Sequence, residues 1–201
     1  MVKAAIQEKV ETQIPEYLIY EVLDGKPIYY KGYEEVLNGN LTLDDIMGCS
    51  GIQSEIISYL LRILYRNVDL KEYRIYTNES GSHIRKNVNL SYDIVIYKKS
   101  ILTGKEITSK YVTVPPYLVI ETDLTGDIQE MTDYEYINTK IQRILDFGAE
   151  KVIWILSSTQ QVIIATPQKD WAIIKWNKDI ELWKEHTFNI AQHLKEEDIE
   201  L

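Results

Sequence analysis

Cysteine is almost absent from this chain, since Cys49 is the only one among 201 residues. A single cysteine can form neither an intramolecular disulfide nor a cysteine-based zinc site, which favours a reducing compartment. Apolar runs are also short. No segment approaches the roughly 20 apolar residues that span a bilayer, and the first residues lack the apolar stretch of a signal peptide. We therefore expect a cytoplasmic protein that does not enter a membrane.

Positive charge is scarce as well. The 22 Lys and Arg residues are outnumbered by 31 Asp and Glu residues, which gives a formal net charge of -9. This balance excludes a uniformly basic nucleic-acid-binding surface, because affinity for nucleic acid depends largely on cations that neutralise phosphates. A local basic patch stays open. It requires residues 85–86, residues 98–99, Lys140 and Arg143 to converge, and the alternative is a solvated surface of mixed charge.

Missing motifs exclude several enzyme classes. The chain has no phosphate-binding loop, no glycine-rich dinucleotide fingerprint and no serine nucleophile elbow. The three histidines, His83, His186 and His193, are too scattered for a zinc-binding helix, so we expect each to be a surface or structural residue.

What is present indicates an ordinary globular chain. Hydrophobic residues make up 45% and charged residues 26% of the sequence, which is enough to bury a sizeable core. The length predicts a single domain over residues 1–201. The acidic residues 195–201 are typical of a solvated tail, with a partner-binding tail as the alternative.

Periodicity predicts mixed secondary structure. Asp24-Gly25 between two apolar or aromatic runs indicates an N-terminal hairpin, and apolar steps of three and four predict a helix from Ser50 to about Asn67. A strand, a helix of about fifteen residues ending at Gly148 and a second strand, within residues 117–156, form the pattern of a parallel βαβ crossover. Further strands are expected at residues 73–77 and 93–97, with a second hairpin over residues 161–176. The fold class is α/β or α+β, with a mixed sheet flanked by helices.

Acidic residues on apolar strands are the strongest chemical signal. Asp93 borders the run Ile-Val-Ile-Tyr97, and Glu121 closes the run Tyr-Leu-Val-Ile. Burying a carboxylate costs several kcal/mol unless a cation or hydrogen-bond donors compensate it. Converging carboxylates are a usual way to hold Mg²⁺, which prefers oxygen ligands. Asp123 lies two residues after Glu121, so both side chains reach one ion if the strand continues.

Three further side chains are candidates for the same site. Lys140 lies beside the apolar stripe of the second helix, between Ile137 and Ile141. It either extends to solvent or points back toward the carboxylates, where an ammonium would stabilise charge on a phosphate. Gln53 and Glu55 flank the stripe of the first helix, and each is either an exposed residue or a site residue.

The ordered set of these segments resembles the Uma-type family of restriction endonucleases, within the PD-(D/E)XK nuclease superfamily. The segments are a Tyr-Glu-Val-Leu-Asp-Gly hairpin, a helix that begins Gly-Ile-Gln-Ser-Glu55, the strand Tyr-Asp93-Ile-Val-Ile, the run Val-Ile-Glu121, and the helix and strand from Lys140 to Trp154. The similarity covers about residues 17–165. It implies a restriction-endonuclease-like core in which Mg²⁺ or Mn²⁺ activates water for attack on a phosphodiester bond, most simply in DNA.

The resemblance also implies residue roles. Asp93 matches the acid of the PD element and Glu121 the acid of the (D/E)XK element. Lys140 matches a lysine at the start of the family's helix motif, and Gln53 and Glu55 fall where the first helix of the superfamily often presents a site residue. Asp123 occupies the position where the simple motif has its lysine, which adds a carboxylate and removes a cation.

Two hypotheses from different classes follow. The first is a metal-dependent endonuclease in which Asp93 and Glu121, with or without Asp123, bind the metal while Lys140 positions water or stabilises the transition state. The second is a catalytically degraded relative that keeps the fold as a nucleic-acid or protein-binding module. Many nucleases of the superfamily act as dimers, so a homodimer is compatible with the first hypothesis.

Overall fold

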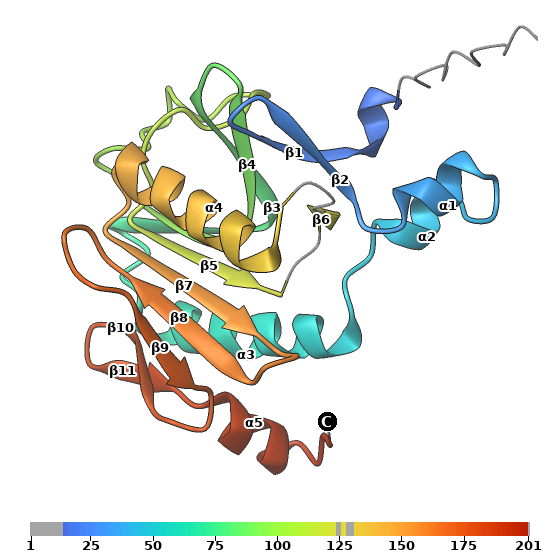
Figure 1. Ribbon diagram of the computed structural model, residues 1–201. Helices are drawn as coiled ribbons and strands as arrows, with labels where there is room; N and C mark the ends of the chain where they lie inside the picture. The colour runs from blue at the N-terminus through green and yellow to red at the C-terminus, as the bar shows by residue number, and fades with distance from the viewer. Residues whose placement is uncertain (1–13, 124–125, 128–130, 201) are drawn as a thin grey trace, which may run out of the picture.

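The computed structural model describes residues 14–123, 126–127 and 131–200 (Figure 1). Within these ranges, no helix is both long enough and apolar enough to cross a membrane. The elements in chain order are η1 (Glu16–Leu18), β1 (Ile19–Leu23), β2 (Lys26–Tyr30), α1 (Tyr33–Leu37), α2 (Leu43–Ile46), α3 (Gly51–Asn67), β3 (Tyr73–Arg85), β4 (Val88–Lys98), β5 (Leu118–Thr122), β6 (Gly126–Asp127), α4 (Asp133–Phe147), β7 (Lys151–Leu156), β8 (Gln161–Ala165), β9 (Ala172–Lys175), β10 (Ile180–Trp183), β11 (His186–Phe188) and α5 (Ile190–Glu196).

A large mixed sheet organises the molecule, in the order β6-β2-β1-β4-β5-β7-β8-β9 with β3 paired to β4. Strands β5 and β7 are parallel neighbours joined through α4, as the βαβ pattern predicts. Both predicted hairpins form, β1 with β2 and β8 with β9. In the first hairpin, Asp24 and Gly25 both have positive φ, the conformation that a two-residue turn between twisted strands requires. The predicted mixed sheet flanked by helices is therefore confirmed.

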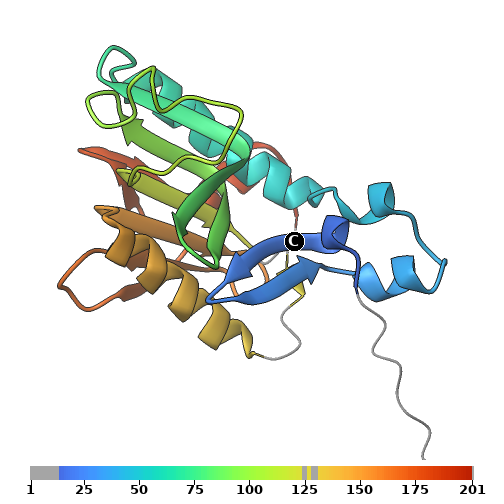
Figure 2. The same cartoon turned by 90° about the horizontal axis from the view of Figure 1, so that it is seen from above.

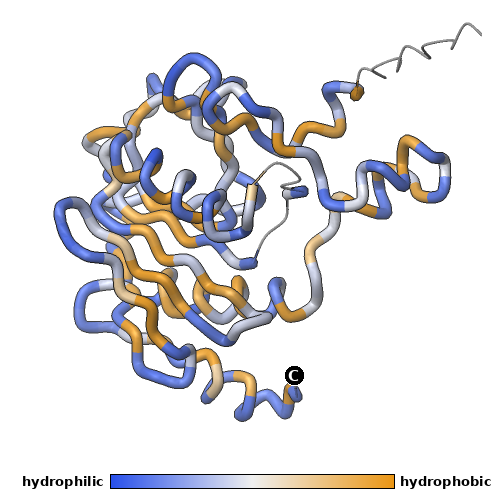
Figure 3. Tube along the Cα trace, in the orientation of Figure 1, coloured by the Kyte–Doolittle hydropathy of each residue, from blue (hydrophilic) through white to orange (hydrophobic). Residues whose placement is uncertain are grey.

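Helices cover the two faces of the sheet, α4 on one and α3 on the other (Figures 1 and 2). Two groups of buried side chains correspond to these layers: one includes Ile141 and Ile144 of α4, and the other includes Ile56 and Leu60 of α3. Hydrophobic residues follow the central strands, and the turns between them are hydrophilic (Figure 3). The short helices α1 and α2 extend away from the sheet beyond β2 (Figure 2).

Both long helices are capped, and α4 ends at Gly148 as the sequence indicated. Ser50 caps α3 by accepting a hydrogen bond from the Gln53 N–H, and Thr132 with Glu135 forms a capping box at the start of α4. Gly148 ends α4 in the left-handed region, at φ 118°. Because the start and end of α4 are fixed, the side chains on its buried face have defined directions.

Two expectations about boundaries were wrong. Strand β4 begins at Val88 rather than at Asp93, and β3 continues from Thr77 to Arg85, because the two strands pair along their whole lengths. In the acidic end of the chain, residues 195–198 and 200 are exposed to solvent, and only Ile199 is partly buried. Helix α5 runs to Glu196, the Ile199 N–H donates to the Leu194 carbonyl, and Ile199 packs against the core.

Candidate functional site

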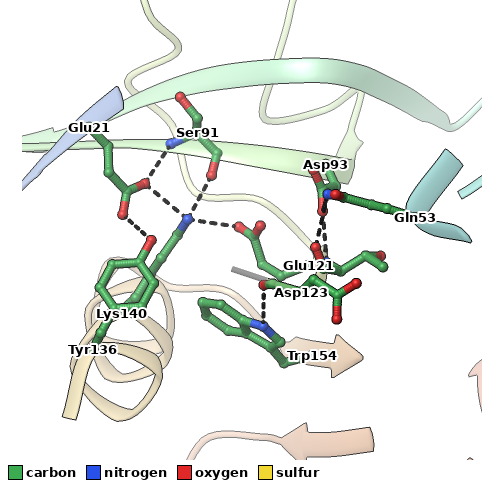
Figure 4. A network of polar contacts seen from close by, with 10 residues as sticks. Glu21, Gln53, Ser91, Asp93, Glu121, Asp123, Tyr136, Lys140 and Trp154 are labelled. Carbon is green, nitrogen blue, oxygen red and sulfur yellow. Dashed lines mark hydrogen bonds and ion pairs between the residues drawn. The ribbon is translucent and has the colours of Figure 1, made fainter. Parts of the chain in front are cut away.

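Buried polar residues gather at one place in the sheet. In the described ranges, every buried Asp, Glu, Lys or Arg belongs to a set of four residues, Glu21, Asp93, Glu121 and Lys140, which we call the buried charge cluster. The buried residues Gln53, Ser91 and Thr122 contact the same cluster. Figure 4 shows the carboxylates of Asp93 and Glu121 between Lys140 on one side and Gln53 on the other. Charged side chains are rarely buried together in a protein core unless they serve a function.

Sheet topology explains why the cluster forms here. Strand β3 pairs along one edge of β4, and two different strands share the other edge: β1 at Asn89 and β5 from Ile94 onward. Ser91 lies between these two pairings. Its N–H donates to Glu21 and its carbonyl accepts from Lys140, so side chains satisfy the backbone where β1 and β5 diverge.

Lys140 is at the centre of the cluster. Its ammonium nitrogen lies 2.9 Å from Glu21 Oε2, 3.0 Å from the Ser91 carbonyl and 3.2 Å from Glu121 Oε1, and its side chain is 1% exposed. The extension to solvent that the sequence left open is therefore excluded. Burial by itself lowers the pKa of Lys140, but the carboxylates of Glu121 and Glu21 raise it well above its ordinary value, so the ammonium stays charged.

Aromatic rings complete the surroundings of Lys140. The ammonium nitrogen lies 5.6 Å to 5.8 Å from the ring centres of Tyr20, Tyr136 and Trp154. Ring faces attract a cation and exclude water from it. The ammonium is held by ion pairs with two carboxylates and by a hydrogen bond to the Ser91 carbonyl, so in this arrangement Lys140 is engaged by the protein itself.

Glu21 is a site residue that the sequence analysis missed. Its Oε1 accepts a hydrogen bond of 2.6 Å from the Tyr136 hydroxyl, and its Oε2 accepts from the Ser91 N–H at 3.3 Å. In the sequence Tyr-Glu-Val-Leu, a glutamate on a hairpin strand is typical of a solvent-facing residue. Helix α4 covers it instead. The one signal in the sequence is a lone acid between aromatic and apolar neighbours, which is too common a pattern to identify a buried residue.

Asp93 and Glu121 lie on the adjacent strands β4 and β5. Asp93 Oδ2 accepts a hydrogen bond of 2.7 Å from the Thr122 N–H, and Gln53 donates to the Thr122 carbonyl at 2.9 Å while its amide nitrogen lies 3.5 Å from Asp93 Oδ2. Burial raises the pKa of Asp93, against the opposing effects of the Thr122 N–H and Lys140. Burial likewise raises the pKa of Glu121 well above its ordinary value; Lys140 opposes this, and Asp93 and Glu21 add to it.

The structure does not bring all predicted residues to this point. The Asp123 carboxylate points toward the turn that follows β7. There it accepts hydrogen bonds from the Ser157 N–H at 2.6 Å and from the Ser157 hydroxyl at 2.8 Å. Its own backbone is in the left-handed region, at φ 61°, so the strand does not continue as the i, i+2 argument assumed. Glu55 contacts His193 of α5 at 2.8 Å, so it stabilises helix packing away from the cluster, while Gln53 reaches Asp93.

Glu79 is a second acid that the sequence analysis did not single out. It lies in a bulge of β3, between the pairs Thr77–Ile94 and Ser80–Tyr92, and both Asn78 and Glu79 have positive φ. Burial and the charge of Asp93 raise the pKa of this carboxyl, which places it within the electrostatic field of the cluster. Bulges commonly redirect a side chain next to a functional site.

The charges of the cluster decide which ligand fits it. With all four groups ionised, three carboxylates and one ammonium leave two negative charges, the charge that one divalent cation neutralises. Glu121 Oε1 is buried and receives no hydrogen bond within the described ranges, so it retains a lone pair for a ligand. Hard divalent cations prefer such oxygens. Among the described residues, no three His, Cys, Asp or Glu side chains are grouped closely enough to hold a metal ion together.

A cleft of about 800 Å³ adjoins the cluster. Gln53 and Asp123 line it on the side of the cluster, and Lys31, Tyr134 and Ser157 are among its other lining residues. Tyr134 is 71% exposed, so its ring is available to a ligand. The cleft therefore approaches the cluster at Gln53 and Asp123 and offers both apolar and polar groups to a ligand.

The basic patch that the sequence left open does not form around the cleft from Arg85, Lys98, Lys140 and Arg143. Asp24 holds Arg143 through two nitrogens, Nε at 2.9 Å and Nη2 at 2.7 Å, and it also pairs with Arg85 at 3.0 Å. Lys98 pairs with Glu150 at 2.6 Å. Lys140 is buried, so these cations are engaged within the protein rather than gathered around the cleft.

Comparison with known proteins agrees with this architecture. No family model matches the chain, and no curated protein sequence does. The crystal structure of a candidate nuclease belonging to DUF820, from Anabaena variabilis ATCC 29413, is similar with a TM-score of 0.64 at 15% sequence identity. The similarity covers 87% of this chain and 89% of that chain. The two proteins therefore share a fold, a mixed sheet with flanking helices.

Proposed function

We propose that this protein is a metal-dependent nuclease of PD-(D/E)XK type, related to the Uma-type enzymes, that hydrolyses phosphodiester bonds in DNA. The observation that carries the proposal is the buried charge cluster, with its surplus of two negative charges beside a cleft. The shared fold with the DUF820 structure supports it, because a candidate nuclease has the same arrangement of sheet and helices.

Each residue then has a role. Asp93 and Glu121 would hold Mg²⁺ or Mn²⁺, Gln53 and the Thr122 N–H orient Asp93, and Lys140 orients Glu121. When bound, a divalent ion supplies charge neutralisation of the phosphate and lowers the pKa of a coordinated water. The Lys140 ammonium lies too deep, at 1% exposure, to contact a phosphate in this conformation, so it acts through Glu121 as a positioning residue.

The cleft would receive the nucleotide next to the scissile phosphate. Tyr134 provides an exposed ring on which a base can stack, a contact that tolerates any sequence. An acidic protein without a gathered basic surface binds the nucleic-acid backbone weakly. We therefore expect micromolar rather than nanomolar affinity at physiological salt, with contacts concentrated near the cleft.

The test is a cleavage assay on plasmid and on single-stranded DNA with Mg²⁺ or Mn²⁺, using wild type, Asp93→Asn and Glu121→Gln. Both variants keep the side-chain shape and remove one charge. Cleavage by wild type alone, abolished by a chelator, is the expected result. Equal cleavage by wild type and both variants, with all three folded, would show that the activity lies elsewhere.

A second function has its own observation. Lys140 forms an ion pair with Glu21, and Asp123 accepts a hydrogen bond from Ser157, so neither side chain is free to contact a substrate. This favours a nucleic-acid-binding module that has lost catalysis. The same assay distinguishes the two, because a binding module retards DNA in a gel without cutting it at any metal concentration.

A further inference from the structure

We propose that Glu21 neutralises Lys140, so that Asp93 and Glu121 keep two unopposed negative charges for one divalent cation. Glu21 is then a positioning residue that sets the metal affinity of the site without touching the metal. The inference rests on the proposed function, and it assigns a role to a residue outside the motif that defines the resemblance.

The contacts of Glu21 fix it toward Lys140. The distance from the Lys140 ammonium to Glu21 Oε2, 2.9 Å, is shorter than the 3.2 Å to Glu121 Oε1. The Tyr136 hydroxyl holds the other oxygen of Glu21 at 2.6 Å, and the Glu21 side chain is 0% exposed. Both carboxylate oxygens of Glu21 are engaged in hydrogen bonds or an ion pair, so Glu21 is poorly suited to be a metal ligand itself.

Glu121 has the opposite character. Its Oε1 is within ion-pair distance of Lys140 but receives no hydrogen bond within the described ranges. If Glu21 were uncharged, the full charge of Lys140 would act on Glu121 and compete with an incoming cation. The surplus charge of the cluster would fall from two to one.

The experiment measures Mn²⁺ affinity by calorimetry on the full chain, with far-ultraviolet circular dichroism to verify folding. Glu21→Gln is isosteric and removes one charge, and we expect its Kd for Mn²⁺ to rise about tenfold or more, because a full charge leaves a poorly hydrated site. The double variant Glu21→Gln/Lys140→Gln restores the surplus of two and should bind Mn²⁺ at least about threefold more tightly than Glu21→Gln, even though Lys140 no longer orients Glu121. Glu16→Gln makes the same charge change on an exposed residue next to β1 and should leave the Kd unchanged.

The double variant separates charge balance from structure. If Glu21 acts as scaffold or as a ligand, removing Lys140 as well cannot restore affinity, and a double variant as weak as Glu21→Gln overturns the inference. If the variant Glu21→Gln/Lys140→Gln fails to fold, Glu21→Leu/Lys140→Met takes its place. It leaves the same surplus of two negative charges, and apolar replacements of buried ion pairs are often tolerated.

Failure of the inference and failure of the function look different. If wild type and Glu21→Gln bind Mn²⁺ with equal affinity, only the role of Glu21 is overturned. Wild type that binds no Mn²⁺ overturns both the role of Glu21 and the metal-dependent activity.

Discussion

Replacing Lys140 by Met tests how strongly the buried charge cluster depends on its single cation. Three oxygens lie within 3.2 Å of the ammonium, those of Glu21, Ser91 and Glu121. Methionine fills a similar volume, so the cavity term is small. The loss comes from two carboxylates left buried without a counter-charge, about 3–5 kcal/mol, and from a carbonyl that loses its donor, about 1 kcal/mol.

The expected loss is therefore about 4–6 kcal/mol, a large share of the 5–15 kcal/mol that typically stabilises a folded protein. Urea unfolding at pH 7 measures it: with a slope of about 2 kcal/mol per molar urea, the midpoint falls by about 2–3 M. Lys98→Met is the matched control, because Lys98 forms a surface pair with Glu150 and its loss costs at most about 1 kcal/mol. A Lys140→Met midpoint as close to wild type as that of the control would refute the account of the cluster.

Three further variants test other contacts. Tyr136→Phe removes the 2.6 Å hydrogen bond to buried Glu21 and should cost about 1.5–3 kcal/mol in urea unfolding; a change below about 0.5 kcal/mol would contradict that contact. Burial raises the pKa of Asp93, so the stability this group provides is present below about pH 4 and is lost as pH rises through its folded pKa; Asp93→Asn should therefore gain stability relative to wild type as pH rises above about 4 in metal-free buffer, and a difference that does not change with pH would contradict the raised pKa. Tyr134→Ala should weaken binding of single-stranded DNA by about tenfold, as loss of one stacking contact predicts, without changing thermal stability; unchanged affinity in fluorescence anisotropy would exclude Tyr134 from the cleft contact.

The sequence predicted the part of the site that local patterns encode. A carboxylate at the end of an apolar run is expensive to bury, so Asp93 and Glu121 stood out from the other acids without any structure. The apolar stripe of α4 placed Lys140 beside the core. Local patterns also gave the end of α4 at Gly148 and the crossover between β5 and β7, since turn residues and periodicity are properties of neighbouring residues.

What the sequence did not reveal depends on contacts between distant segments. Glu21 has the pattern of a solvent-facing residue of a hairpin, and it is buried only because α4 packs over that hairpin. Lys140 points into the protein because it pairs with Glu21. The sequence could not decide between this direction and solvent, because the burial of Glu21 was not predicted. The first half of β4, Val-Asn-Leu-Ser-Tyr, pairs with β3, so the start of β4 at Val88 depends on a contact with another strand. The turn of Asp123 toward Ser157 likewise arises where β5 and β7 end side by side.

The central claim is that the buried pair Asp93 and Glu121 accepts one divalent cation. Calorimetric titration of the metal-free protein with Mn²⁺, beside Asp93→Asn, tests it most directly. The account predicts one ion per chain for wild type and no measurable binding for the folded variant. Absence of binding to wild type, or equal binding to both proteins, would contradict it.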